Sequence, residues 1–289
     1  MYLRQVYATK HPAISFEIFP PKGNYPINQL LEQLEIFSQL KPDYISVTYG
    51  AGGSTKDKTI KIAGMIKENF QIEPLAHLTC ITSTKDQIHS IISDLSNHDI
   101  ENVLALRGDI PTDPNFVFPT PLHFEFASDL IRELRKERKF CIGAAFYPEG
   151  HIEAPNREID FKNVAYKAKQ GTDFLISQMF FDNAYFIKSV KKLREMGVNQ
   201  PISAGIMPIT NIKQIQRIAD LCGATFPPNL LKELKTRADN PKHVEDFGIQ
   251  YATDQIADLL NSGVEGIHIY TMNKPRIAEK IIQNIRNLR

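Results

Sequence analysis

Short apolar segments alternate with longer segments of helical periodicity along almost the whole chain. The apolar segments are interrupted by few polar residues, which indicates strands that are buried on both faces. We expect strands at residues 14–19, 44–49, 74–79, 102–106, 140–146, 174–181, 202–206 and 266–270. The helices that follow them are expected at residues 27–40, 56–70, 85–96, 125–138, 160–169, 184–196, 212–221 and 275–285.

This alternation predicts an α/β fold with a parallel sheet, and eight strand–helix pairs predict closure into a (β/α)8 TIM barrel. An open doubly wound sheet is the structural rival. It usually carries a glycine-rich turn after its first strand, whereas Phe19-Pro20-Pro21-Lys22 stands there. Two insertions are expected, a proline-rich loop at 110–124 and helical material at 225–262 with one long helix at 244–260. Without a Gly/Ser-rich linker, residues 1–289 are expected to form a single domain.

Composition and charge exclude several classes of protein. The chain is 42% hydrophobic and 23% charged, and its formal net charge of +1 gives no reason to expect nucleic acid or an anionic membrane as partner. The amino terminus is polar, and no apolar run reaches the length of a membrane span, so neither a signal peptide nor a membrane anchor is expected. Cys80, Cys141 and Cys222 are far apart, which favours free thiols in the cytoplasm over a disulfide or zinc site.

Polar residues stand where the predicted strands end, which is the face that carries the chemistry in barrels of this type. Glu17 lies within an apolar strand, and a buried carboxyl is costly unless it faces a polar cavity or a partner. Such a group suits proton transfer, although a structural ion pair is an alternative. Arg107, Gly108 and Asp109 follow the fourth strand, and Gln178 interrupts the sixth. The Arg is able to bind phosphate or carboxylate, and the amide is able to bind the edge of a heteroaromatic ring.

These residues name no reaction by themselves. His77 at the third strand is as compatible with a satisfied core position as with a ligand contact, and the glycines after the second strand indicate a tight turn. No Ser-His-Asp order, zinc spacing or HExxH motif is present. The polar strand ends have aromatic neighbours, and the sequence shows neither a metal-binding pattern nor an evident nucleophile. This combination favours an organic cofactor.

Eight short motifs stand at the expected strand ends. They are Phe16-Glu17-Ile18-Phe19-Pro20-Pro21, Ser46-Val47-Thr48-Tyr49-Gly50-Ala51, His77-Leu78-Thr79-Cys80, Leu106-Arg107-Gly108-Asp109, Tyr147-Pro148-Glu149-Gly150-His151, Gln178-Met179-Phe180-Phe181-Asp182, Gly205-Ile206-Met207-Pro208 and Tyr270-Thr271-Met272-Asn273. Together, and in this order, they resemble the methylenetetrahydrofolate reductase family over nearly the whole chain.

The resemblance implies a flavin-binding (β/α)8 barrel with non-covalent FAD. In that family NADH or NADPH reduces the flavin, leaves, and is replaced by 5,10-methylenetetrahydrofolate, which becomes 5-methyltetrahydrofolate for methionine synthesis. By resemblance Glu17 is the general acid that opens the folate ring, and Asp109 lies between flavin and pterin. The implied substrate-binding residues are Glu17, Thr48, Asp109, Gln178, Gln214 and Lys274. The implied cofactor-binding residues are Thr48, Tyr49, Ala51, His77, Arg107, Gly108, Asp109, Ala127, Tyr147, His151, Ala154, Asp160, Asn163 and Lys167.

The chain departs from the family pattern at Lys274, where Arg is frequent, at Ile218, where some relatives have an aromatic residue, and at Phe126, where Tyr is frequent. The resemblance also implies a homo-oligomer, either dimer or tetramer, without the regulatory domain of eukaryotic relatives. Three alternatives stay open: a protein electron donor, a non-catalytic flavin- or folate-binding barrel, and a Schiff-base lyase. The non-catalytic barrel would be expected to lose Glu17 or Asp109, and the lyase would need a lysine within a strand.

Overall fold

Eight parallel strands form a closed barrel in the computed structural model, which describes residues 1–21, 27–49, 56–111, 113–137 and 139–286. Each strand pairs with its neighbour in the chain, and the last strand pairs with the first, with Glu17 beside Tyr270. The strands are β1 (Ala13–Ile18), β2 (Tyr44–Val47), β3 (Glu73–Thr79), β4 (Asn102–Leu106), β5 (Cys141–Phe146), β6 (Phe174–Ser177), β7 (Ile202–Ile206) and β8 (Gly266–Tyr270). The predicted (β/α)8 barrel is therefore confirmed.

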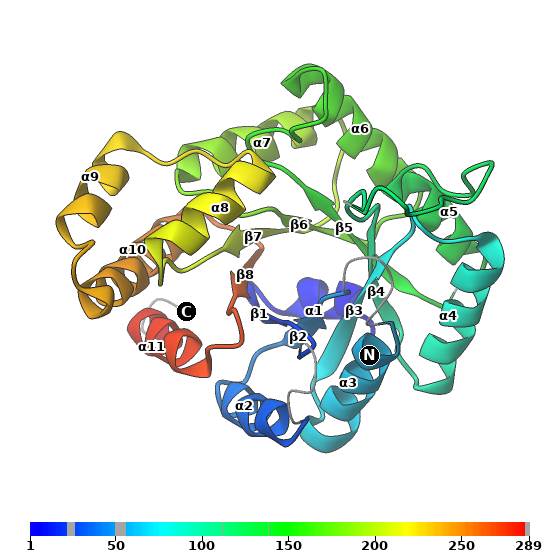
Figure 1. The fold of residues 1–289 in the computed structure, drawn as a ribbon, viewed down its shortest axis with the longest axis horizontal. Coiled ribbons are helices and arrows are strands. Elements are labelled where there is room, and N and C mark those ends of the chain that lie inside the picture. The colour runs from blue at the N-terminus through cyan, green and yellow to red at the C-terminus, as the bar shows by residue number, and fades with distance from the viewer. Residues whose placement is uncertain (22–26, 50–55, 112, 138, 287–289) are drawn as a thin grey trace.

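Helices surround this barrel, as Figure 1 shows in a view that looks into it. They are α1 (Leu3–Thr9), α2 (Ile27–Gln39), α3 (Lys56–Phe70), α4 (Lys85–Asn97), α5 (Ala127–Lys136), α6 (Arg157–Lys169), α7 (Asn183–Glu195), α8 (Ile212–Cys222), α9 (Pro228–Thr236), α10 (Pro241–Asn261) and α11 (Pro275–Ile285). The second insertion forms α9 and α10, and α10 packs against α11.

Several predicted element boundaries differ from the structure. The long helix expected at 244–260 is α10 and begins at Pro241, β2 ends two residues before its predicted end at 49, and α5 is two residues shorter at each end than the helix expected at 125–138. Two further differences have a capping side chain at the observed helix start. The sixth strand ends at Ser177 instead of continuing to residue 181, and Asp182 caps the next helix, α7, by accepting a hydrogen bond from the Ala184 amide. α6 begins at Arg157, three residues before its predicted start at 160, because the Asn156 side chain accepts from the Ile159 amide.

The helix α1 was not predicted, and it closes the amino-terminal end of the barrel. Leu3, Val6 and Tyr7 are its buried residues, at the spacing that places them on one face of a helix. They pack against residues from inside the barrel, among them Tyr44 and Phe174. The opposite end of the barrel is formed by the carboxyl termini of the strands, and it is the end where active sites of such barrels lie.

Within the described residues, no helix is both long enough and apolar enough to cross a membrane.

Candidate active site

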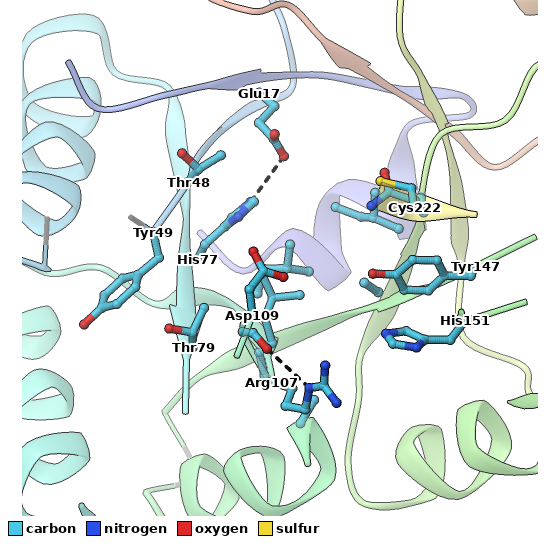
Figure 2. Close-up of a pocket in the computed structure, with 18 of the residues that line it drawn as sticks. Glu17, Thr48, Tyr49, His77, Thr79, Arg107, Asp109, Tyr147, His151 and Cys222 are labelled. Atoms are coloured by element: carbon cyan, nitrogen blue, oxygen red, sulfur yellow. Dashed lines mark hydrogen bonds and ion pairs between the residues drawn. The ribbon is translucent and has the colours of Figure 1, made fainter. Parts of the chain in front are cut away.

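A cavity of about 400 Å³ opens at the carboxyl ends of the strands, and all eight strands or the residues directly after them contribute to its wall. Figure 2 shows its polar side chains, with Glu17 and Asp109 both directed into it. It is lined by Glu17, Thr48, Tyr49, His77, Thr79, Ile81, Thr82, Leu104, Ala105, Leu106, Arg107, Gly108, Asp109, Ala127, Ala145, Tyr147, His151, Lys167, Ile176, Gln178, Met207, Ile218, Cys222 and Tyr270.

Most of the residues singled out from the sequence meet in this cavity. Those that line it are Glu17, Thr48, Tyr49, His77, Arg107, Gly108, Asp109, Ala127, Tyr147, His151, Lys167 and Gln178. Ala154, Asp160 and Asn163 are absent from the wall. Asp160 nevertheless contacts it indirectly, because its carboxylate accepts a hydrogen bond of 3.2 Å from the His151 amide. Ala51 lies outside the described residues.

Gln214 and Lys274 lie beside the cavity and do not line it. Gln214 belongs to a much smaller adjoining pocket that shares Met207 and Ile218 with the main cavity. The ammonium of Lys274 donates to the Thr210 hydroxyl at 2.8 Å, and Thr210 lines the same small pocket. An elongated ligand that leaves the cavity past Met207 would therefore meet these two polar residues.

Glu17 is held between two imidazoles. Its Oε2 lies 3.5 Å from Nε2 of His77 and 3.4 Å from Nε2 of His268. Burial lowers the pKa of His77 to about 4, against the opposing effect of Glu17, so this ring is neutral at neutral pH. Nε2 of His77 is buried without a hydrogen-bond partner among the described atoms, so we interpret the 3.5 Å contact as proximity and not as an ion pair.

His268 of β8 also lies beside Glu17, and the sequence analysis did not single it out. The imidazole is completely buried, and its Nδ1 lies 2.7 Å from the Ser15 hydroxyl. A signal was present, because His268 and Tyr270 alternate with isoleucines along β8. Alternate residues of a barrel strand share a face, so this pair points inward, as Glu17 does from β1.

The opposite side of the cavity is cationic. Arg107 forms a two-pronged ion pair with Glu153, in which Nη2 donates to Oε1 at 2.8 Å. Lys167 is half-buried and donates to the Ala145 carbonyl, and desolvation of its ammonium lowers its pKa to about 8. Burial and the neighbouring Arg107 lower the pKa of His151. Arg107 and Lys167 are two cationic side chains, and Glu153 is an exposed counter-ion of Arg107. This arrangement suits the binding of an anionic group such as a diphosphate.

Gly108 makes the turn that brings Asp109 into the cavity. Its φ is +89°, in the region that only glycine adopts readily, and an added Cβ would lie 2.8 Å from Cβ of Thr79. A glycine is therefore required between Arg107 and Asp109, since any side chain there would collide with Thr79.

Asp109 lies near the charged Arg107 and near two groups that are uncharged at neutral pH. Burial raises the pKa of Tyr147 to about 12 and that of Cys222 to about 11, and the Asp109 carboxylate adds to both shifts. Figure 2 shows the Tyr147 hydroxyl directed toward Asp109. Thr79, Thr82, Met207 and Cys222 were not predicted for the site, because nothing in their local sequence separates them from core or loop residues, and Tyr270 was missed together with His268.

The donor set fits a flavin dinucleotide better than a metal. Within the described residues, no group of three His, Cys, Asp or Glu side chains is arranged to hold a metal ion. The cavity instead combines aromatic and hydroxyl groups near Tyr49 and Tyr147 with the cationic pair Arg107 and Lys167. An isoalloxazine ring system and a diphosphate need these two kinds of surroundings.

Comparison with known proteins gives one consistent family. The methylenetetrahydrofolate reductase family model matches residues 2–286. "Methylenetetrahydrofolate reductase (NADH) 1" of Arabidopsis thaliana is 33% identical over 294 residues, which cover 98% of this chain and 50% of that protein. The "5,10-methylenetetrahydrofolate reductase" of Escherichia coli is 32% identical over 272 residues, which cover 94% of this chain and 90% of that protein. The chain thus spans about half the length of the plant relative and most of the bacterial one.

A solved structure shares the fold. It is an uncharacterized protein from Clostridium thermocellum, described as binding two copies of 5-methyl-5,6,7,8-tetrahydrofolic acid. The TM-score is 0.70 at 15% sequence identity, and the match covers 100% of this chain and 99% of that one.

Proposed function

Because this chain belongs to the methylenetetrahydrofolate reductase family, we propose that it reduces 5,10-methylenetetrahydrofolate to 5-methyltetrahydrofolate. The reductant is NADH or NADPH, and the electrons pass through bound FAD in two separate half-reactions. The observation that carries this proposal is the meeting of Glu17, Asp109 and Gln178 in one cavity with a cationic side wall. The folate ligand named for the Clostridium thermocellum protein, which has the same fold, supports the substrate class.

The cationic wall would hold the cofactor. Arg107 and Lys167 would offset the charge of the diphosphate, and Arg107 would do so beside its existing partner Glu153. Thr48 and Tyr49, directly after β2, would lie against the flavin ring. When bound, the flavin would accept a hydride from the nicotinamide and pass it to the one-carbon unit.

Glu17 would supply the proton in the folate half-reaction. The methylene group bridges two nitrogens, and it becomes an electrophile when the bond to one of them breaks as that nitrogen is protonated. Glu17 is 6% exposed at the bottom of the cavity, so a bound folate would cover it from water. The neighbouring His77 is neutral at neutral pH because burial lowers its pKa, so it places no positive charge next to the carboxyl.

Asp109 and Gln178 would orient the folate. Gln178 follows β6 and is able to donate and accept at the edge of the pterin. Asp109 would place a negative charge close to both flavin and pterin, where it would make the flavin harder to reduce and hold the folate in position. The glutamate-bearing tail would leave past Met207 toward Gln214 and Lys274.

Anaerobic stopped-flow absorbance tests the proposal. The purified protein should carry a flavin whose absorbance bleaches on mixing with NADH or NADPH and returns on mixing with methylenetetrahydrofolate. Running both nucleotides separately identifies the preferred donor. A protein that fails to bind added FAD, or a reduced flavin that methylenetetrahydrofolate does not reoxidise, would refute the assignment.

A further inference from the structure

Helix α8 forms one wall of the cavity. Gln214, Ile218 and Cys222 are four residues apart, so they lie on one face of this helix. Ile218 and Cys222 line the cavity, and Gln214 and Ile218 line the small pocket beside it. Figure 2 shows Cys222 across the cavity from Tyr49. The wall formed by α8 therefore lies on the side that we assign to the folate, away from the side that we assign to the flavin ring.

The packing of α8 is separate from the main core of the barrel. Of its eleven residues, Ile215 and Ala219 are buried. They pack with α9 and with the cavity residues Met207 and Tyr270, in a cluster distinct from the main core. In the last turn of α8, Leu221 is 66% exposed. Because a helix end with few buried side chains opens readily, this end of the wall needs support from another part of the chain.

The loop between β5 and α6, residues 147–156, supplies such support. Thr225 lies three residues after the end of α8, and Glu149 of this loop accepts both of its donors. The Thr225 amide lies 3.1 Å from Oε1 and 3.2 Å from Oε2 of Glu149, and the Thr225 hydroxyl donates to Oε2 at 2.5 Å. Hydrogen bonds to a carboxylate are stronger than those between neutral groups. We name Glu149 and Thr225 the clasp.

Close packing on either side of the clasp fixes the path of the chain after α8. Gly223 ends the helix with a φ of +69°, and an added Cβ there would lie 2.6 Å from Cγ2 of Ile152, which belongs to the same loop as Glu149. After the clasp, the Phe226 ring is stacked on that of Phe181, with centroids 4.4 Å apart and planes inclined by 17°. The end of α8 therefore meets the β5–α6 loop through an apolar contact and a polar one.

We propose that Glu149 is a positioning residue, which holds the carboxyl-terminal turns of α8 in place through Thr225 and so completes the wall against which the folate binds. Glu149 lies outside the cavity wall, so it acts on the ligand through α8. The inference rests on the proposed function, since it assigns folate to this side of the cavity. Water competes with the exposed donors of Thr225, so the clasp should contribute about one net hydrogen bond, or about fivefold in an equilibrium constant.

Glu149→Ala removes the clasp, and amide hydrogen exchange measures the effect on α8 without cofactor or substrate. The amides of residues 218–222 should exchange about fivefold faster than in the wild type, because the turn opens more often. The amides of α4, which lies on the opposite side of the ring of helices in Figure 1, should keep their wild-type rates.

The folate half-reaction gives a second readout. The apparent affinity for a ligand is reduced by the fraction of molecules that hold the binding conformation. The methylenetetrahydrofolate concentration that gives half the limiting rate of flavin reoxidation should therefore rise about fivefold in Glu149→Ala. The limiting rate itself should stay within about twofold of wild type, since the reacting groups are unchanged. The affinity for FAD, measured by flavin fluorescence, should not change.

Conservative variants separate the hydrogen bonds of the clasp from its charge. Glu149→Gln keeps one acceptor and gains a donor for Thr225, so it should stay within about twofold of wild type in both readouts. Thr225→Val removes the hydroxyl, should shift both readouts in the same direction as Glu149→Ala, and carries the test if Glu149→Ala does not fold. Thr225→Ser keeps the hydroxyl and should restore them. The double variant of Glu149→Ala and Thr225→Val should be little worse than Glu149→Ala, because the two residues share one interaction.

Two variants outside the clasp are the matched controls. Thr236→Val removes a hydroxyl that donates to the Glu233 carbonyl at 2.9 Å on α9, and Glu158→Ala breaks an exposed ion pair with Lys192. Neither should alter the exchange of α8 or the folate dependence.

Unchanged exchange of α8 in Glu149→Ala, or an unchanged folate dependence, would overturn the inference. Glu149→Gln that behaves like Glu149→Ala would do the same, because the charge and not the hydrogen bonds would then be responsible. An equal loss of FAD affinity would also overturn it, since Glu149 would then support the β5–α6 loop and not α8. Exchange is measured without turnover, so faster exchange of α8 in a protein that reduces no folate would support the clasp and refute the proposed function.

Discussion

Glu17→Gln separates the two half-reactions most clearly. The substitution keeps the shape of a side chain that is 6% exposed and removes only its capacity to give up a proton. Glu17 makes no short hydrogen bond through its side chain to the imidazoles, since the contacts to His77 and His268 are 3.5 and 3.4 Å. The amide therefore breaks no strong interaction, and the free energy of unfolding should change by no more than about 1 kcal/mol.

The kinetic effect should be much larger than the effect on stability. General acid catalysis contributes about 10²- to 10⁴-fold to a rate. We expect flavin reoxidation by methylenetetrahydrofolate to fall by about that factor, while flavin reduction by the nicotinamide stays within about twofold of wild type. Anaerobic stopped-flow absorbance measures the two steps separately in the same preparation.

Glu133→Gln is the matched control. Glu133 is also a buried glutamate beside a histidine, 8% exposed and 2.8 Å from His89, but it lies on α5 away from the cavity wall. It should lose stability through its broken contacts with His89 and Lys136 and keep both rates. An equal loss of both half-reactions in Glu17→Gln, or an unchanged folate half-reaction, would remove Glu17 from the role of acid.

Three further predictions concern charge in the cavity. Asp109→Asn should raise the flavin reduction potential and slow folate turnover, and spectroelectrochemistry that finds an unchanged potential would contradict the electrostatic role. Arg107→Ala should weaken FAD binding by about tenfold or more, measured by flavin fluorescence, because one charge-assisted contact to the diphosphate is lost; unaltered affinity would place the diphosphate elsewhere. Burial lowers the pKa of His77 to about 4 from an ordinary 6.5. Between these two pH values the unfolded chain binds a proton at His77 that the folded protein does not bind. The free energy of unfolding should therefore fall as the pH drops from 6.5 to 4. His77→Gln should flatten urea-denaturation stability over that window, and an equally steep dependence would contradict a neutral His77.

The barrel could be predicted because its strands are buried on both faces. Every residue of β1, β2, β6, β7 and β8 is buried, so each appears in the sequence as a short apolar run. Helix α1 was missed because it has seven residues, three of them buried, and its partners come from distant strands. A short helix of this kind forms through tertiary packing, which local periodicity does not record.

Some residues of the candidate site could also be predicted from the sequence, and others could not. Glu17 and Asp109 could be found because polar residues are unusual at the ends of apolar strands. His268 and Tyr270 carried the same signal, but their meaning depends on which face of β8 is turned inward. The partner of Arg107 could not be found at all, since Glu153 is 46 residues away and lies in a loop whose course depends on the fold. Contacts between separate loops follow from tertiary structure, and the sequence alone offers no spacing rule for them.

The crystal structure of the oxidised protein with 5-methyltetrahydrofolate bound tests the central claim most directly. Our account predicts the flavin ring in the cavity, the pterin stacked on it with its edge at Gln178, and the Glu17 carboxyl within reach of the folate nitrogens. A folate bound elsewhere, or a flavin that leaves Glu17 and Asp109 on opposite sides of a closed wall, would contradict it.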